Sequence, residues 1–376
     1  MENESSSIIS PNEIKGTALL LYSGGLDTTY IARKIQGHNI KIILLNIMLD
    51  EDRGEDFESD LEIIYDNALE EFIADYLAVA IRNDFFVDNE YPISASISFP
   101  LIAKKAVEYA SKLGASTIIH GAEVSQNAMS RFNKTIRRLN RDLFICPYAI
   151  YDTSSRKEKI KFLKKSLEEN NKYAVSRDKN IWCECIENGC YDDDSYPVNN
   201  SHFMSSDEGK EKICILTLGF EKGLPKSIDK NEKSLKEIIK HIKCLSSGFN
   251  IGVYSSYEFN GLEKTRELHF SPVAAILHRA KKSLERVCLE ENELEIKCFL
   301  DRKWVNEVIR GEWNSEICMA IDSFNNVITE KINGSVILKL SSGGIQILST
   351  QRTSPKKHFL NQDYINKRLL EIKEIQ

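Results

Sequence analysis

The sequence lacks the marks of several large protein classes. No apolar run in its 376 residues approaches the roughly 20 residues that a membrane-spanning helix requires. The first residues, MENESSSIISPNE, are polar and acidic and do not resemble a secretory signal peptide. The chain also shows no internal repeat and no low-complexity block. We therefore expect a cytoplasmic globular protein without a membrane partner.

An excess of positive charge is missing as well. Lys and Arg number 50 against 56 Asp and Glu, which gives a net charge of −6. Non-specific affinity for nucleic acid requires a basic surface, so we predict no nucleic-acid partner. Basic clusters occur at 134–141 and 157–165, but apolar residues alternate with them at helical spacing. We interpret both clusters as solvated helix faces.

The nine cysteines are odd in number and scattered, and three of them gather at Cys183, Cys185 and Cys190. Without an export signal, such usage is typical of a reducing compartment rather than of a disulfide scaffold. No Cys-x-x-Cys or histidine pair supplies the second half of a zinc site near this group. We predict no metal site and interpret these residues as structural thiols.

Strands that alternate with helices dominate the first half of the chain. Strand-like apolar runs occur at 15–22, 39–47 and 115–120, and helical patterns that end at a glycine occur at 27–36 and 101–113. Continuously apolar strands are typical of a parallel sheet that helices cover on both faces. The fold class is therefore predicted to be α/β, with this domain at 15–170 and a flexible tail at 1–14.

The composition changes at 172–207, which is rich in Asp, Asn, Ser and Cys and which we interpret as a connection between domains. Beyond it we predict a strand at 213–219, a turn at 223–225, helices at 233–245 and 273–289, and a hairpin at 336–348. A second, α+β domain is expected at 171–350. An amphipathic tail helix is expected at 351–376.

The stretch LYSGGLDTT, residues 21–29, joins the first predicted strand to the first predicted helix. Two glycines let the backbone approach a phosphate closely, and the amides of the following helix then point at the anion. Because the lysine of the Walker pattern is absent, the turn suits a leaving pyrophosphate held by amides and hydroxyls. Asp27 would cap the helix or orient a metal ion on the nucleotide.

This turn resembles the pyrophosphatase loop of the adenine-nucleotide α-hydrolase superfamily, and specifically that of argininosuccinate synthases. Further blocks that resemble this family follow in the same order over residues 15–355: YPIS (91–94), PLIAKK (100–105), IHGA (119–122), RF (131–132), LGFEKGLP (218–225), KTR (264–266), SP (271–272), GEW (311–313) and INGSV (332–336). The resemblance implies a nucleotide-binding domain of the PP-loop ATP pyrophosphatase type, then a synthetase domain and a C-terminal helix. It also implies a homo-oligomer, a tetramer or a dimer.

The resemblance implies a two-step ligase reaction that uses ATP and Mg²⁺. A ureido oxygen of a citrulline-like acceptor attacks the α-phosphate and pyrophosphate leaves, and then an amine attacks the adenylated carbon and AMP leaves. The positions that resemble the family's ATP site are Tyr22, Ser23, Gly24, Gly25, Leu26, Asp27, Thr28, Thr29, Leu45 and Gly121. Leu45 replaces a small family residue, and Met48 and Leu49 replace a Gly-Gln pair. Either adenosine recognition differs from that of the family, or Met48 and Leu49 are ordinary core residues.

The acceptor end matches the family in part. The positions that resemble its citrulline-binding set are Tyr91, Ser96, Asn127, Arg131 and Ser176. Arg131 has the fork that binds a carboxylate at both oxygens. A family serine corresponds to Cys185 and a family tyrosine to His269, which is either a site residue or a packing residue. The glutamate expected to bind the acceptor's amine falls within 256–258, and Glu258 is the candidate.

The amine end departs most from the family. The amine-binding positions are Glu123, Asn127 and Ala128, of which Glu123 replaces a threonine and Ala128 an aspartate. A glutamate where a dicarboxylate should bind repels it unless one group takes up a proton. We therefore predict that aspartate is not the nucleophile and that a neutral or cationic amine suits the site better.

Three alternatives stay open. The first is a ligase, in one of two versions: a divergent argininosuccinate synthase, or a specialised-metabolism ligase that acts on a ureido, guanidino-precursor or amide substrate. A neighbouring possibility is a sulfur-inserting enzyme that uses Cys183, Cys185 or Cys190, and such a thiol should be exposed with a lowered pKa. A non-catalytic homologue that only binds nucleotide is the third, although the intact glycine turn argues against it.

Overall fold

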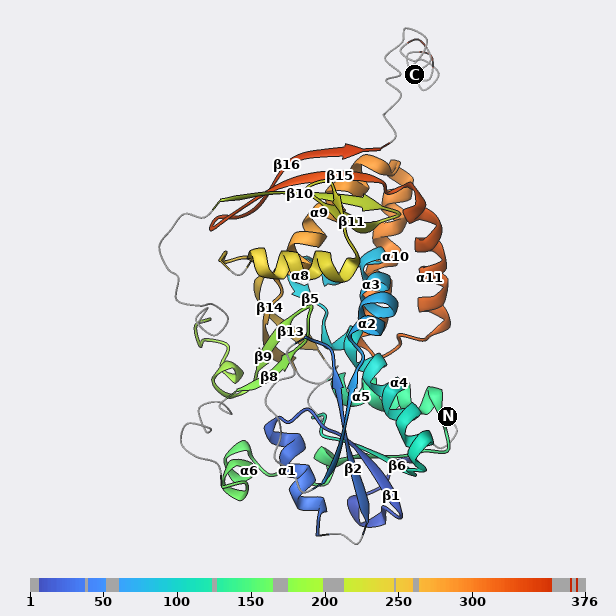
Figure 1. The fold of residues 1–376 in the computed structure, drawn as a ribbon, viewed down its shortest axis with the longest axis vertical. Coiled ribbons are helices and arrows are strands. Elements are labelled where there is room, and N and C mark those ends of the chain that lie inside the picture. Colours follow the sequence, from blue (N-terminus) through green and yellow to red (C-terminus); the bar gives the residue numbers. More distant parts are fainter. Residues whose placement is uncertain are drawn as a thin grey trace.

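The computed structural model describes residues 7–37, 40–51, 61–123, 127–164, 175–198, 213–246, 248–259 and 264–353, together with residues 366 and 370. A parallel sheet with its helices forms the lower half of the molecule in Figure 1, and antiparallel sheets with longer helices form the upper half. Among the described residues, none of the helices has the length and apolar character to cross a membrane.

The lower sheet has five parallel strands in the order β3-β2-β1-β6-β7. They are β1 (Thr17–Leu21), β2 (Lys41–Met48), β3 (Glu62–Asn67), β6 (Thr117–His120) and β7 (Phe144–Pro147). Leu20 of the central strand pairs with Leu44 on one side and with Ile119 on the other, and all three are fully buried. Burial on both faces explains why these strands are apolar along their whole length.

Helices cover both faces of this sheet. Leu20 packs with Ile31 of α1 (Leu26–Ile35), whereas its neighbour Leu19 points the other way and packs with Ala106 of α4 (Ala95–Leu113). Helix α5 (Asn127–Leu139) adjoins α4 on that second face. Helix α4 ends at Gly114, whose φ of +63° is the left-handed conformation that glycine adopts readily. The predicted α/β class and the predicted glycine stop are confirmed.

One segment of the first half crosses into the upper half. It contains α2 (Leu69–Glu71), a π-helical turn (Phe72–Leu77), α3 (Ala78–Arg82) and the small hairpin β4 (Phe86–Val87) and β5 (Tyr91–Pro92). Figure 1 shows α2 and α3 beside α10 (Glu291–Ile309) and α11 (Glu316–Ile328). Phe72 and Phe85 share a buried core with Trp304 and Val336. The two halves are therefore interlocked through one hydrophobic core.

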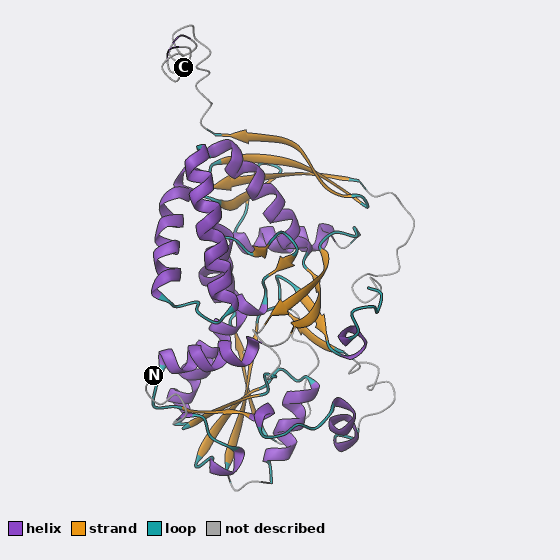
Figure 2. Ribbon diagram, turned by 180° about the vertical axis from the view of Figure 1, so that it is seen from behind, coloured by secondary structure: helices purple, strands orange, loops and turns teal. Residues whose placement is uncertain are grey.

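The upper half holds two antiparallel sheets, visible from behind in Figure 2. The five-stranded sheet contains β10 (Cys214–Glu221), β11 (Leu224–Ile228), β12 (Asn231–Glu232), β15 (Gly334–Ser341) and β16 (Gly344–Arg352). The four-stranded sheet contains β13 (Val253–Phe259), β14 (Lys264–Phe270), β9 (Glu184–Glu187) and β8 (Ser176–Lys179). Helices α8 (Leu235–Ser246) and α9 (Pro272–Cys288) pack with α10 and α11 against them. The hairpin predicted at 336–348 is confirmed as β15 and β16.

Predictions were also made for the connecting segment 172–207 and for the terminal segments 1–14 and 351–376. The interpretation of 172–207 as a mere connection is wrong for β8 and β9, which are strands of the four-stranded sheet. Within the predicted tail 1–14, residues 7–14 contact the parallel sheet, since the Ile9 backbone N–H donates to the Ile145 carbonyl over 3.0 Å. The helix predicted at 351–376 is wrong at its start, where residues 351–352 belong to β16, and the rest falls almost wholly outside the described residues.

Candidate nucleotide and acceptor site

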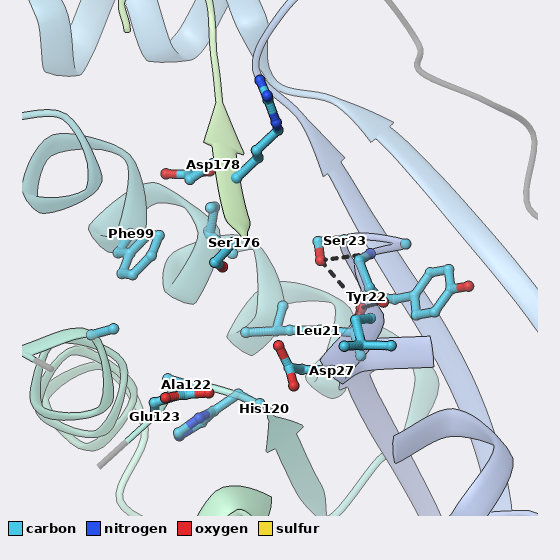
Figure 3. A pocket seen from close by; sticks show the side chains of 18 of the residues that line it. Leu21, Tyr22, Ser23, Asp27, Phe99, His120, Ala122, Glu123, Ser176 and Asp178 are labelled. Carbon is cyan, nitrogen blue, oxygen red and sulfur yellow. Dashed lines mark hydrogen bonds between the residues drawn. The ribbon is translucent and has the colours of Figure 1, made fainter. Parts of the chain in front are cut away.

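A cavity of about 900 Å³ opens at the carboxyl edge of the parallel sheet (Figure 3). Its lining comes from the turn after β1, the ends of β2 and β6, parts of α4 and α5, and β8 of the upper half. Ligands of open parallel sheets bind at this edge. The predicted site residues that line it are Tyr22, Ser23, Gly24, Gly25, Leu26, Asp27, Thr28, Leu45, Gly121, Glu123, Ala128 and Ser176.

The glycine turn is tied together by short polar contacts. The Gly25 N–H donates to Ser23 Oγ over 3.2 Å, and Ser23 Oγ lies 3.2 Å from Thr28 Oγ1. Gly24 has a φ of +76°, in the left-handed region that favours glycine. Gly25 is the N-cap of α1, so the first amides of this ten-residue helix are directed at the cavity end of β1. Thr29 contacts the Tyr22 hydroxyl at 3.3 Å and supports the turn from behind.

Gly121 lets the end of β6 approach the start of α1. A Cβ atom at this position would lie 2.9 Å from Ile31 Cδ1 and 3.8 Å from Asp27 Cβ. The first of these distances is shorter than real Cβ contacts, so a larger residue would require the flexible end of the Ile31 side chain to move. The glycine that resembles the family's nucleotide-site glycine therefore packs closely against the first turns of α1.

Several basic side chains that were not predicted as site residues lie around the cavity. Lys159 of α6 (Arg156–Phe162) lies 2.7 Å from Asp27 Oδ1, and Arg156 Nη1 lies 3.9 Å from Oδ2 of the same carboxylate. Arg156 lines the cavity together with Arg177 and Lys179 of β8. The interpretation of 157–165 as a solvated face is wrong for Lys159, whose side chain is only 13% exposed. The basic cluster at 157–165 is the sequence feature that could have identified Lys159 as a site residue.

Two ionisable groups of the cavity have shifted pKa values. His120 is 1% exposed and its Nε2 lies 2.9 Å from Asn133 Oδ1. Burial lowers the pKa of His120 to about 4, so the ring is neutral near pH 7. Burial also raises the pKa of Glu123, and the charge of Asp27 raises it further. Figure 3 shows His120 and Glu123 below Ser176 and Asp178 of β8.

Four of the predicted acceptor residues gather around one buried ion pair. Arg131 of α5 contacts Glu258 of β13, with side chains that are 2% and 4% exposed. The Glu258 carboxylate also accepts from the Asn127 backbone N–H at 3.2 Å and from the Tyr91 hydroxyl at 3.4 Å. Arg131 Nε donates to the Ile309 carbonyl over 2.8 Å. Glu258 is thus the member of 256–258 that faces Arg131, but this cluster is packed beside the cavity rather than lining it.

The remaining acceptor residues lie in different places. Ser176 lines the cavity, while Ser96 is 1% exposed and its hydroxyl has no hydrogen-bond partner among the described residues. His269 is 2% exposed, and its ring centroid lies 4.9 Å from that of Tyr91. His269 Nε2 is 3.1 Å from Oε2 of Glu267, a residue that no sequence motif marked as part of the site. The predicted set is therefore divided between the cavity and its packed surroundings.

The thiols near the site are poorly suited to sulfur transfer. Cys183 is 4% exposed, and burial raises the pKa of its thiol. Burial and the nearby charge of Glu267 hold the pKa of Cys185 well above its usual range. A reactive sulfur carrier needs the opposite, an accessible thiol with a lowered pKa. Neither thiol lines the cavity.

Comparison with known proteins assigns both halves of the chain. A family model described as arginosuccinate synthase N-terminal HUP domain matches residues 17–168, and one described as arginosuccinate synthase C-terminal domain matches residues 175–366. The argininosuccinate synthase of Pyrobaculum aerophilum is 31% identical over 356 residues, which cover 90% of this chain and 88% of the relative. That of Pyrococcus furiosus is 30% identical over 338 residues, covering 86% and 82%. That of Clostridium kluyveri is 29% identical over 352 residues, covering 89% and 87%.

Proposed function

The chain belongs to the argininosuccinate synthase family of ATP-dependent ligases, and from this premise we propose that it joins a citrulline-like acceptor to an amine other than aspartate. A ureido or amide oxygen of the acceptor attacks the α-phosphate of ATP, and pyrophosphate leaves. The amine nitrogen then attacks the activated carbon, loses a proton, and displaces AMP. The observation that carries this proposal is Glu123 on the lining of the cavity that the glycine turn enters.

The nucleotide end supplies the groups that a leaving pyrophosphate needs. Amides of the turn and the hydroxyls of Ser23 and Thr28 replace the missing Walker lysine, and Arg156 adds a fixed positive charge. Asp27 and Asp178 present carboxylate oxygens at the cavity, which are the ligands that Mg²⁺ prefers. The ion neutralises phosphate charge when bound. We place ATP in the domain at 15–170 and assign the synthetase role to 171–350.

The acceptor end suits an α-amino acid. Such a molecule carries a carboxylate and an ammonium group close together, which match Arg131 and Glu258. Because these two residues now satisfy each other, the acceptor must separate them, and each charge then gains a partner of the opposite sign. Tyr91 and the Asn127 amide, which already bond Glu258, would keep that carboxylate in place.

The amine end explains why aspartate is disfavoured. Glu123 and Asp27 already place two carboxylates near this part of the cavity, and their proximity contributes to the raised pKa of Glu123 after the larger effect of burial. A substrate dicarboxylate would add like charge to a partly buried acidic position, whereas a cationic amine would be attracted to it. Ionised Glu123 is also a candidate base for the proton that the attacking amine releases.

The experiment measures the two half-reactions separately. Exchange of labelled pyrophosphate into ATP should appear with a ureido or amide acceptor alone, and AMP formation should then require an amine from a neutral and cationic panel. We expect the charge-removing Glu123→Gln variant to raise kcat/KM for aspartate at least about tenfold, and the charge-keeping Glu123→Asp variant to leave it low.

The outcomes separate the parts of the proposal. Robust turnover of the wild-type enzyme with citrulline and aspartate would overturn the choice of amine but not the ligase chemistry. Absence of exchange with every acceptor, despite ATP binding, would instead favour the non-catalytic homologue. We also propose a homo-oligomer, a tetramer or a dimer, which light scattering of the purified chain would measure.

A further inference from the structure

Two adjacent strands place a thiol, an imidazole and a carboxylate on one face of the four-stranded sheet. Cys185 of β9 pairs directly with His269 of β14 in the antiparallel register. Glu267 lies two residues before His269 on the same strand, so its side chain points to the same face. One ligand atom from each of the three residues lies within 4.8 Å of the other two.

We propose that Cys185, Glu267 and His269 form a binding site for a divalent metal ion of the zinc type. Zn²⁺ takes thiolate sulfur at about 2.3 Å and imidazole nitrogen or carboxylate oxygen at about 2.0–2.2 Å in tetrahedral geometry, which puts ligand atoms about 3.4–3.6 Å apart. Glu267 Oε2 lies 3.1 Å from His269 Nε2 and 3.8 Å from Cys185 Sγ. Small side-chain movements therefore complete three corners of a tetrahedron and leave the fourth for water.

The charges around this cluster favour a cation. Arg131 and Glu258 form an ion pair beside the cluster, and the charge of Arg131 also reaches Glu267. Among the described residues, the His269 imidazole is the basic group in direct contact with Glu267, which is 6% exposed. The Arg131 charge is shared with Glu258, so a buried Glu267 carboxylate still gains from a cation bound to it directly. One M²⁺ ion with a thiolate, a carboxylate and a neutral imidazole forms a neutral set. The thiol proton is released to solvent when the metal–sulfur bond forms, which balances the exchange.

The sequence supplies an independent reason. Cys185 and His269 are the two positions at which the acceptor region departs from the family pattern, where a serine and a tyrosine would stand. The fold places these two departures opposite each other, and each exchanges a hydroxyl for a ligand that borderline-soft metals prefer. The sequence alone does not reveal this site, because no second ligand pair lies near Cys185 and His269 is distant from it along the chain.

The competing description is a hydrogen-bonded carboxylate. In that arrangement the Cys185 thiol and the His269 ring both donate to Glu267, and no ion is needed. The two descriptions differ in stoichiometry, in proton release and in the chemistry of sulfur. The metal proposal does not depend on the ligase activity, so it can fail while the proposed function stands.

The experiment titrates the chelator-stripped, full-length chain with Zn²⁺ alone against a chromophoric competitor. We expect one high-affinity site per chain and release of a proton from the thiol at neutral pH. Cys185→Ser and His269→Tyr, which restore the residue types expected from the family, should each weaken binding by about a hundredfold or more, because loss of a mere outer-shell partner already costs roughly 10–100-fold. Cys190→Ser is the matched control, since its thiol lies outside the cluster and should leave the affinity unchanged.

Cobalt(II) binding gives a second readout that does not require any variant to fold. The wild-type chain loaded with Co²⁺ should show a thiolate-to-metal charge-transfer band and the strong visible absorption of tetrahedral cobalt. The band should disappear in Cys185→Ser and persist in Cys190→Ser. A wild-type spectrum without the thiolate band, or zinc affinity that Cys185→Ser leaves intact, would overturn the proposal.

Discussion

At the scale of single residues, burial sets the charge state of the cavity. His120 ends β6 with its imidazole almost wholly covered and bonded through Nε2 to Asn133. A ring held neutral in this way preserves the shape of the cavity floor across the physiological pH range. It also links folding to pH, because the unfolded chain binds a proton that the folded chain excludes.

We predict that His120 contributes an acid sensitivity to stability. Its pKa falls from 6.5 to about 4 on folding, so the unfolded state binds more protons between these values and stability is lost as the pH drops through them. Between pH 7 and pH 5 the loss attributable to this ring is about 2 kcal/mol. Urea unfolding of wild type and His120→Gln at both pH values measures it, and the variant should lose that much less.

The exposed His241 is the matched control for this prediction. Its replacement in His241→Gln removes an imidazole that solvent already reaches in the folded chain, and the wild-type pH difference should remain. If His120→Gln and wild type lost equal stability between the two pH values, the ring would have to be accessible to protons in the folded protein.

Residue roles were predictable where local chemistry dictates them. Ser23 and Gly24 follow from the needs of a phosphate turn, and the structure places both on the cavity. Lys159 and Arg156 were not predicted as site residues. A basic residue at helical spacing gives the same sequence pattern whether its helix faces solvent or packs against another element. Only the position of α6 against Asp27 decides between them.

At the scale of elements, the site depends on how closely β6 approaches α1. Gly121 directly follows His120, the last residue of β6, and a Cβ there would meet Ile31 Cδ1. The turn's amides belong to the same helix. The spacing of strand and helix therefore couples packing to nucleotide binding.

We predict that Gly121→Ala destabilises the fold by roughly 1 kcal/mol, because the end of the Ile31 side chain has to move, and that it raises KM for ATP. Ile31→Val removes the clashing Cδ1 atom and should cost about 0.5–1.5 kcal/mol alone. The double variant should be less destabilised than the sum of the two, which thermal unfolding and a double-mutant cycle would show. Strictly additive effects would mean that the two side chains do not compete for the same space.

Helices and strands were predictable where their buried residues are apolar and recur with a regular period. Strands β1, β2 and β6 and the glycine stop of α4 follow from such patterns, whereas β3 and β7 of the same sheet were not predicted. Strand β8 was missed because its residues, Ser-Arg-Asp-Lys, face the cavity and carry no apolar alternation. Helix α10 was missed for a related reason, since Lys297 and Asp301 are buried on its inner face and blur the amphipathic pattern.

At the scale of the whole molecule, the two halves are joined by charge as well as by apolar packing. Lys281 and Glu285 of α9 meet Lys297 and Asp301 of α10 in a group whose four side chains are at most 1% exposed. Lys281 Nζ also donates to the carbonyl of Asn83, at the end of the segment that crosses from the first half, over 2.6 Å. The pairs within each helix have i,i+4 spacing, but the Lys297–Glu285 pair and the bond to Asn83 join separate elements and have no local sequence pattern, so they could not be predicted.

We predict that Lys297→Met destabilises the protein by about 3–5 kcal/mol, because it leaves Glu285 and Asp301 buried with one cation too few. Lys303→Met on the same helix is the control. Lys303 pairs with Glu307 at 2.6 Å but is 43% exposed, so its loss should cost less than about 1 kcal/mol. The urea midpoint, followed by far-ultraviolet circular dichroism, compares the two. Equal shifts would mean that the buried charges are not a structural link between the halves, and that apolar packing around Phe72 and Trp304 alone holds them together.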